Sequence, residues 1–180
     1  ENQDFFSKCL SANQSERPDF PEICEFITRE NFLSLFDDID IEKVHDFLDN
    51  FQSDAEALLI NGLLFLNDES YHTLAVNYFR QSALLENTTA MLLLSNMLLI
   101  GDGVEKNLQQ SVHYCKLAAE KGNFKAMNNY ANRLREGTGV EVNIPEAIRY
   151  YKKAIESGGI SFAMNNYANM LRFGLGVEVN

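Results

Sequence analysis

The amino-acid sequence predicts an all-α protein, an α-solenoid built from antiparallel helix pairs stacked in tandem. Three observations support this prediction. Residues 126–143 recur almost unchanged as residues 163–180, with 15 of 18 positions identical. The motif Gly-x-Gly-Val begins at Gly101, at Gly137 and again at Gly174, so its copies are 36 and then 37 residues apart. Two helical patterns fit between consecutive motifs, and a period of this length is typical of stacked-repeat proteins.

The first helix of a repeat is predicted from about Phe124 to Glu136. Its apolar residues recur at helical spacing, and they are Ala126, Met127, Tyr130, Ala131 and Leu134. The Gly-x-Gly-Val motif follows. Its first glycine is expected to end the helix, because a glycine just past a helix end readily takes the left-handed conformation that closes the last turn. A glycine pair at this place could also suggest a phosphate site, but its recurrence after every first helix favours a helix stop.

The second helix is predicted from about Ile144 to Ser157. Pro145 lies near its start, where a missing N–H costs little. Its apolar stripe consists of Ala147, Ile148, Tyr151, Ala154 and Ile155. Gly158 and Gly159 end this helix, and the tyrosines of the second helices are expected to pack in the core.

These patterns resemble the Sel1-like repeat family, a relative of the tetratricopeptide repeats. The matching features are the alanine that opens the first helix, a small residue five positions later, Gly-x-Gly-Val, and the run Glu-Ala-x-x-Tyr-Tyr-Lys-Lys-Ala that begins at Glu146. The resemblance covers about residues 54–180 and implies a right-handed superhelix with a groove for protein partners. The expected repeats span about 54–89, 90–125, 126–162 and a truncated 163–180.

Residues 1–36 are predicted to form a separate helical segment. Cys9-Leu10, Ser15-Glu-Arg17-Pro18, Phe20 and Ile23 resemble the C-terminal end of a tyrosine-kinase-like protein kinase domain. By this resemblance, Arg17 would form a buried ion pair with a glutamate of the kinase. The alternative is an ordinary helix, turn and helix. Kinase chemistry needs a Gly-rich loop, a nucleotide lysine and a catalytic aspartate, and none is present, so we expect no catalytic residues in this stretch.

Residues 37–53 are predicted to form a connecting helix, capped by Asp40, that docks on the first repeat. The chain begins with Glu1, and Asn180 falls just before the second helix of its repeat. We therefore expect a longer parent protein. The last helix would expose apolar residues that favour self-association, and these are Met164, Tyr167, Ala168 and Leu171.

Charge and composition limit the classes of partner. The net charge is −11, with 17 acidic and 4 basic residues in 1–70 against 9 and 11 in 71–180. No basic stripe could follow phosphates, so we expect no nucleic acid partner. The acidic part could meet a basic partner or be a solvated surface.

The sequence also lacks the patterns of a membrane span, a metal site and a disulfide framework. No apolar run reaches the length of a membrane span, and no histidine has a ligand-type neighbour at metal spacing, so neither a membrane, a metal nor a cofactor is expected. The cysteines are Cys9, Cys24 and Cys115. Three widely spaced cysteines do not form a disulfide framework, and a cytoplasmic location follows most simply.

Asparagines on the first helices are the candidate binding residues. They lie off the apolar stripe, on the helices that line the concave surface of such superhelices. Their amides can donate to and accept from a peptide backbone, and nearby guanidinium groups suit a carboxylate. The candidate peptide-binding residues are Asn96, Asn128, Asn132, Arg135, Asn165, Asn169 and Arg172. The alternative is that these asparagines bridge adjacent helices or face water.

Two hypotheses of function follow. The first is a protein–protein interaction scaffold or adaptor that binds peptide segments in the groove of the repeat array. The second is the C-terminal regulatory or substrate-docking tail of a serine/threonine protein kinase of the tyrosine-kinase-like group, whose catalytic lobe lies upstream. A Gly-rich loop, a strand lysine and a His-Arg-Asp catalytic loop in the preceding sequence would establish the second hypothesis.

Overall fold

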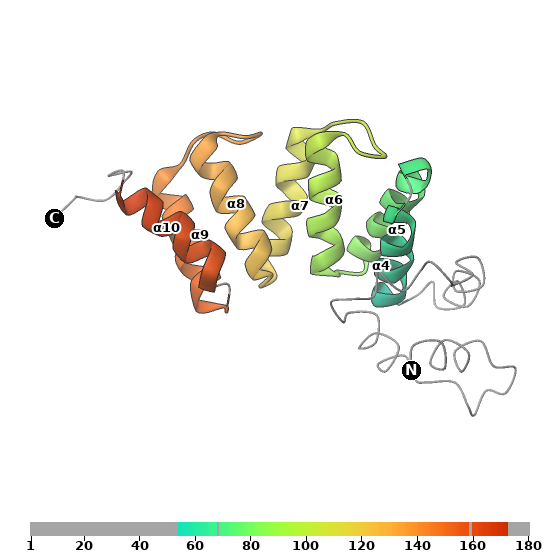
Figure 1. The fold of residues 1–180 in the computed structure, drawn as a ribbon, viewed down its shortest axis with the longest axis horizontal. Helices are drawn as coiled ribbons and strands as arrows, with labels where there is room; N and C mark the ends of the chain where they lie inside the picture. Colours follow the sequence, from blue (N-terminus) through green and yellow to red (C-terminus); the bar gives the residue numbers. More distant parts are fainter. Residues whose placement is uncertain (1–53, 68, 159, 173–180) are drawn as a thin grey trace, which may run out of the picture.

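The computed structural model describes residues 54–67, 69–158 and 160–172 (Figure 1). Within them the helices follow one another as α4 (Ala55–Leu64), α5 (His72–Leu84), α6 (Thr88–Ile100), α7 (Leu108–Glu120), α8 (Phe124–Glu136), α9 (Ile144–Glu156) and α10 (Ile160–Arg172). Two short 3₁₀ turns, η3 (Phe65–Asn67) and η4 (Glu69–Tyr71), join α4 to α5. The kinase-like segment and the connecting helix predicted for residues 1–53 lie outside the described residues.

The helices stack side by side in chain order, from α4 at the right of Figure 1 to α10 at the left. Each helix packs on the next one along the chain, and none of the described residues forms a strand. This arrangement confirms the predicted all-α solenoid of helix pairs.

Side-chain caps start the helices. Asp54 accepts hydrogen bonds from the backbone N–H groups of Glu56 and Ala57 at 2.8 and 3.1 Å. Helix α5 has no side-chain cap. An asparagine side chain accepts from the first turn of each helix from α6 to α9, and the capping residues are Asn87, Asn107, Asn123 and Asn143. Such caps satisfy N–H groups that have no partner inside the helix. The starts of α6 to α9 are therefore each fixed locally by one amide side chain.

The Gly-x-Gly-Val motif has two separate structural roles. Its first glycine ends the first helix in the left-handed region, with φ of 89° at Gly101 and 75° at Gly137, as predicted. Its second glycine packs against the start of the preceding second helix. A Cβ added to Gly139 would lie 2.8 Å from the carbonyl oxygen of Leu108, and one added to Gly103 would overlap the backbone of His72. The motif therefore also joins successive repeats.

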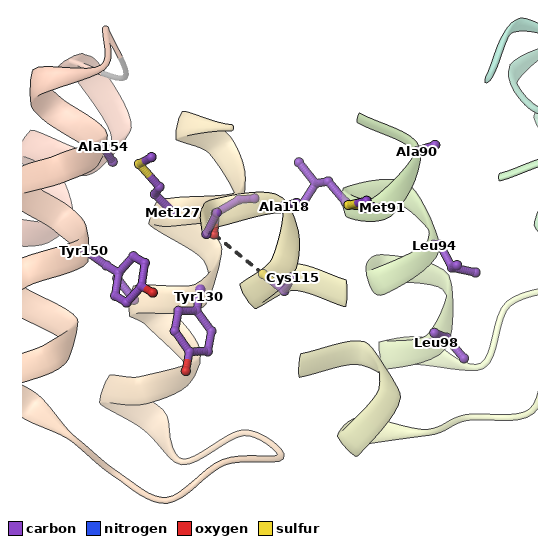
Figure 2. Packing of buried hydrophobic residues seen from close by; sticks show 14 of the residues in the cluster. Ala90, Met91, Leu94, Leu98, Cys115, Ala118, Met127, Tyr130, Tyr150 and Ala154 are labelled. Carbon is purple, nitrogen blue, oxygen red and sulfur yellow. Dashed lines mark hydrogen bonds between the residues drawn. The ribbon is translucent and has the colours of Figure 1, made fainter. Parts of the chain in front are cut away.

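Small and aromatic residues fill the space between the helices (Figure 2). Every residue of the stripe predicted on α8 is buried. The rings of Tyr130 and Tyr150 meet edge to face at 4.8 Å, an arrangement that aromatic pairs favour. Burial raises the pKa of Tyr130 to about 12. The Cys115 thiol points to the carbonyl oxygen of Ala126 at 3.6 Å. Burial also raises the pKa of this thiol, so it stays protonated.

Candidate functional site

Residues of α6 and α8 line two neighbouring hollows. The larger has a volume of about 490 Å³ and is lined by Thr89, Leu92, Leu93, Asn96, Phe124, Lys125, Asn128 and Asn129. The smaller has a volume of about 250 Å³ and is lined by Asn96, Leu99, Asn129, Asn132, Arg133, Glu136 and Thr138. Asn96 and Asn129 line both, so the hollows are adjacent. The two together are called the inner groove below.

The structure brings three of the predicted residues together in this groove, namely Asn96, Asn128 and Asn132. Arg135 lines neither hollow, and its guanidinium is paired with the carboxylate of the adjacent Glu136. On α10, Asn165 is exposed and Asn169 is partly buried. Neither of them lines the two hollows, and the side chain of Arg172 lies outside the described residues.

Two of these asparagines bridge helices, which is the alternative to ligand binding given in the sequence analysis. Asn132 accepts a hydrogen bond from the hydroxyl of Tyr151 on α9 at 2.5 Å. Asn128 accepts one from the amide of Asn166 on α10 at 2.9 Å. An amide offers two donor and two acceptor positions, so both keep unused capacity. The side chain of Asn96 is exposed and has no hydrogen bond to any residue that the structure describes.

Arg133 belongs to the groove although helical periodicity alone did not mark it. It is only 5% exposed, and its Nη1 atom has no hydrogen-bond partner among the described residues. Burial lowers the pKa of its guanidinium. A signal was present in the sequence, because the other repeats have Met97 and Met170 at the corresponding position. A charged residue at a position that is otherwise apolar deserves a separate explanation.

Comparison with known proteins identifies the repeats. A family model for the Sel1 repeat matches residues 88–123, 124–159 and 161–180. The chain belongs to the Sel1 repeat family. Each of the first two matched segments holds one complete helix pair, α6 with α7 and α8 with α9. No curated protein matches the chain.

Solved structures share the Sel1 fold. A Sel1 repeat protein from Oxalobacter formigenes has a TM-score of 0.66 at 22% identity, over 78% of this chain and 56% of that one. A protective antigen present in uropathogenic Escherichia coli strains, described as having an SLR fold, has a TM-score of 0.74 at 24% identity, over 100% and 38%. The cysteine rich protein B of Helicobacter pylori has a TM-score of 0.58 at 15% identity, over 72% and 98%.

The chain thus spans about half of the Oxalobacter protein and less of the E. coli antigen. The absence of catalytic residues from this stretch stays a prediction. Among the residues described here, no three His, Cys, Asp or Glu side chains cluster as metal ligands, and no helix has the length and hydrophobicity of a membrane span. The kinase-like segment, the repeat boundaries, the cytoplasmic location and the lack of a nucleic acid partner stay predictions.

Proposed function

We propose that this chain is a protein–protein interaction scaffold whose inner groove binds peptide segments. Sel1 repeat proteins are generally protein-interaction modules, and stacked helical repeats offer extended surfaces for such partners. The observation that carries the proposal is that the two hollows adjoin and share Asn96 and Asn129. A segment in the larger hollow can therefore continue into the smaller one.

The wall chemistry of the larger hollow suits an extended peptide. Leu92, Leu93 and Phe124 supply apolar surface for side chains. Asn96 offers an amide without a hydrogen bond to any described residue. Each residue of a peptide presents one N–H and one C=O, and an amide side chain can bond both. Recognition of this kind depends on the backbone and tolerates many sequences, while the apolar positions add selectivity.

The proposed surface extends beyond α6 and α8. The hydrogen bond from Asn166 to Asn128 links α10 to α8, and Asn165 and Asn169 of α10 are included in the proposed surface. Arg172 would add a cation to this surface. Arg135 would first have to leave Glu136, so we assign it a smaller contribution than the asparagines.

Selection of a random linear peptide library on the immobilised chain tests the proposal. We expect enriched peptides, and we expect Asn96→Ala to weaken their binding about 3- to 10-fold, the value of one hydrogen bond. Fluorescence anisotropy with labelled peptides measures this change. Asn77→Ala is the matched control, because Asn77 is an exposed asparagine on α5 outside the groove. Enriched peptides that bind Asn96→Ala and wild type equally, or a selection without enrichment, would refute the proposal.

A further inference from the structure

The two nearly identical copies, 126–143 and 163–180, differ at only three positions. Arg133, Glu136 and Thr138 in the first copy correspond to Met170, Phe173 and Leu175 in the second. All three residues of the first copy line the smaller hollow of the inner groove. The copies are otherwise identical, asparagines included, so the sequence difference between them is concentrated in this one hollow.

Packing alone does not explain an arginine at position 133. Met97 and Met170 occupy the corresponding positions of the neighbouring repeats and are 5% and 1% exposed, so a methionine satisfies the fold. Arg133 is equally buried, yet it has no ion pair or side-chain hydrogen bond to any described residue. A buried charge without an acceptor is unfavourable. The described part of the chain therefore supplies no partner for the guanidinium of Arg133.

The surroundings of Arg133 favour an anionic partner. Glu136 lines the same hollow, but its carboxylate is paired with Arg135. The Cys115 thiol is the ionisable group that acts electrostatically on Arg133, and burial raises the pKa of that thiol, so it stays neutral. The remaining polar groups in the wall are amides and one hydroxyl, from Asn96, Asn129, Asn132 and Thr138. These groups can donate hydrogen bonds to an anion.

We propose that Arg133 binds the side-chain carboxylate of an aspartate or glutamate in the peptide that occupies the inner groove. This inference rests on the proposed function and names the chemistry of one position of its ligand. A carboxylate can accept two parallel hydrogen bonds from one guanidinium. Arg133 is only 5% exposed but lines the smaller hollow, so a peptide side chain that enters this hollow meets it. The nearby Glu136 disfavours a doubly charged phosphate more strongly than a carboxylate.

Parallel selection of the random peptide library on wild type and on Arg133→Met tests this inference. Arg133→Met should fold, because methionine is buried at the same position in two other repeats, and its melting temperature reports this. A second variant carries Arg133→Met, Glu136→Phe and Thr138→Leu, which makes 126–143 identical to 163–180. We expect wild type to enrich peptides with Asp or Glu at one fixed position, and both variants to lose this preference.

Binding of synthetic peptides with blocked ends then measures the size of the effect. For an enriched acidic peptide, we expect Arg133→Met to lower the affinity about 10- to 100-fold, the value of hydrogen bonds to a charged group. The same peptide with Glu replaced by Gln should bind both proteins almost equally, as expected when two groups interact directly. Arg149→Met is the matched control, because Arg149 is half exposed on α9 and paired with Glu146.

The outcomes separate this inference from the proposed function. Enriched peptides without an acidic position, or with equal affinity for wild type and Arg133→Met, overturn the role of Arg133 and leave peptide binding intact. Affinity that depends on a free C-terminal carboxylate, and is lost when that end is blocked, also overturns the side-chain assignment. Failure to enrich any peptide refutes the proposed function, and this inference with it.

Discussion

The repeat at 88–123 and the repeat at 124–159 have the same helices but very different first-helix sequences. Helices α6 and α8 each have 13 residues and end at a left-handed glycine. Helix α6 reads TTAMLLLSNMLLI and is almost wholly apolar, whereas α8 reads FKAMNNYANRLRE and carries asparagine and arginine at several positions. The shared architecture therefore depends on a small set of positions, and the others are free to vary.

This small set includes the positions at which the two helices of a pair contact each other most closely. In the first repeat, Ser95 donates to the carbonyl oxygen of Ser111 at 2.8 Å, and Ser111 donates to that of Ser95 at 2.5 Å. In the second repeat, Ala131 and Ala147 take these places. All four residues are fully buried. What the two pairs share is small size, which allows the backbones to approach closely. Hydroxyl groups are tolerated there because each donates to the backbone carbonyl of the other residue.

One asparagine position has different roles in the two repeats. Asn132 accepts the hydroxyl hydrogen bond of Tyr151, which is fully buried. In the preceding repeat the corresponding residues are Asn96 and Cys115, and the cysteine bonds the carbonyl of Ala126 instead. Asn96 is consequently left exposed. The same residue type at the same place is structural in one repeat and available to a ligand in the other.

Substitution of the second glycine of the motif should have the largest effect in both repeats. Gly103→Ala and Gly139→Ala force a Cβ into the preceding second helix and hold an alanine at positive φ. We expect a loss of roughly 2–5 kcal/mol in the free energy of unfolding. The larger loss is expected at Gly103, where the added Cβ would lie closer to backbone atoms than at Gly139. Urea denaturation measures it.

Gly122→Ala is the control for the glycine pair. Gly122 has φ of 98°, but nothing lies within 4 Å of an added Cβ. Its loss should therefore be limited to about 1–2 kcal/mol of backbone strain. Equal losses at Gly122 and Gly139 would show that conformation alone, and not contact between repeats, explains the second glycine.

Asn132→Ala should destabilise the chain more than Asn96→Ala. Removal of the Asn132 amide leaves the buried Tyr151 hydroxyl without this partner, at a cost of about 1–3 kcal/mol. Asn96→Ala should change stability by less than about 0.5 kcal/mol, as is usual for exposed sites. Thermal melts of the two variants test this difference. Adding Tyr151→Phe to Asn132→Ala should restore part of the loss, and equal melting temperatures for the two asparagine variants would contradict the assigned roles.

The smallest expected effect distinguishes the junction before the 88–123 repeat from the junction after it. His72 Nδ1 lies 2.5 Å from Asp102 and its Nε2 lies 3.1 Å from the carbonyl oxygen of Leu66. The hydrogen bond to Asp102 is the main cause of a His72 pKa above the ordinary value of 6.5. The corresponding residues at the next junction are Leu108 and Thr138, which do not titrate.

The stabilising form of His72 is therefore the protonated one. Its contribution is fully present below about pH 6.5 and is lost as the pH rises through the raised pKa of the folded state. We expect the melting temperature of wild type, relative to His72→Leu, to fall as the pH rises from about 6.5 through the raised pKa of His72. His113→Leu is the control, because His113 is exposed and has no hydrogen bond with any described residue. A constant difference between wild type and His72→Leu would exclude this contribution.

Most of the fold could be predicted from the sequence, because its causes are local and recur. The apolar stripes, the helix-ending glycines and Pro145 each act within one or two turns of chain, so they can be read along a single repeat. The partner of Asn132 could not be predicted in this way. Tyr151 lies 19 residues away on another helix, and a helical wheel of α8 contains no information about it.

The candidate site was predicted only in part for the same reason. The helical wheel selected Arg135, but contact with Glu136 withdraws its charge from the groove. The helical wheel did not select Arg133, because that residue lies on the buried side of the helix, where the other copies have methionine. Whether a polar side chain meets a partner or an open hollow depends on the neighbouring repeat, which a single periodic pattern does not describe.

Gly103 and Gly139 have a consequence for the shape of the whole array. Each lets one loop lie close against the helix before it, so a side chain there would change how two successive repeats meet. Because each repeat contacts only its neighbours, a small change of orientation at one junction would displace every later repeat. The geometry of the array is therefore sensitive to two positions at which a hydrogen atom takes the place of a side chain.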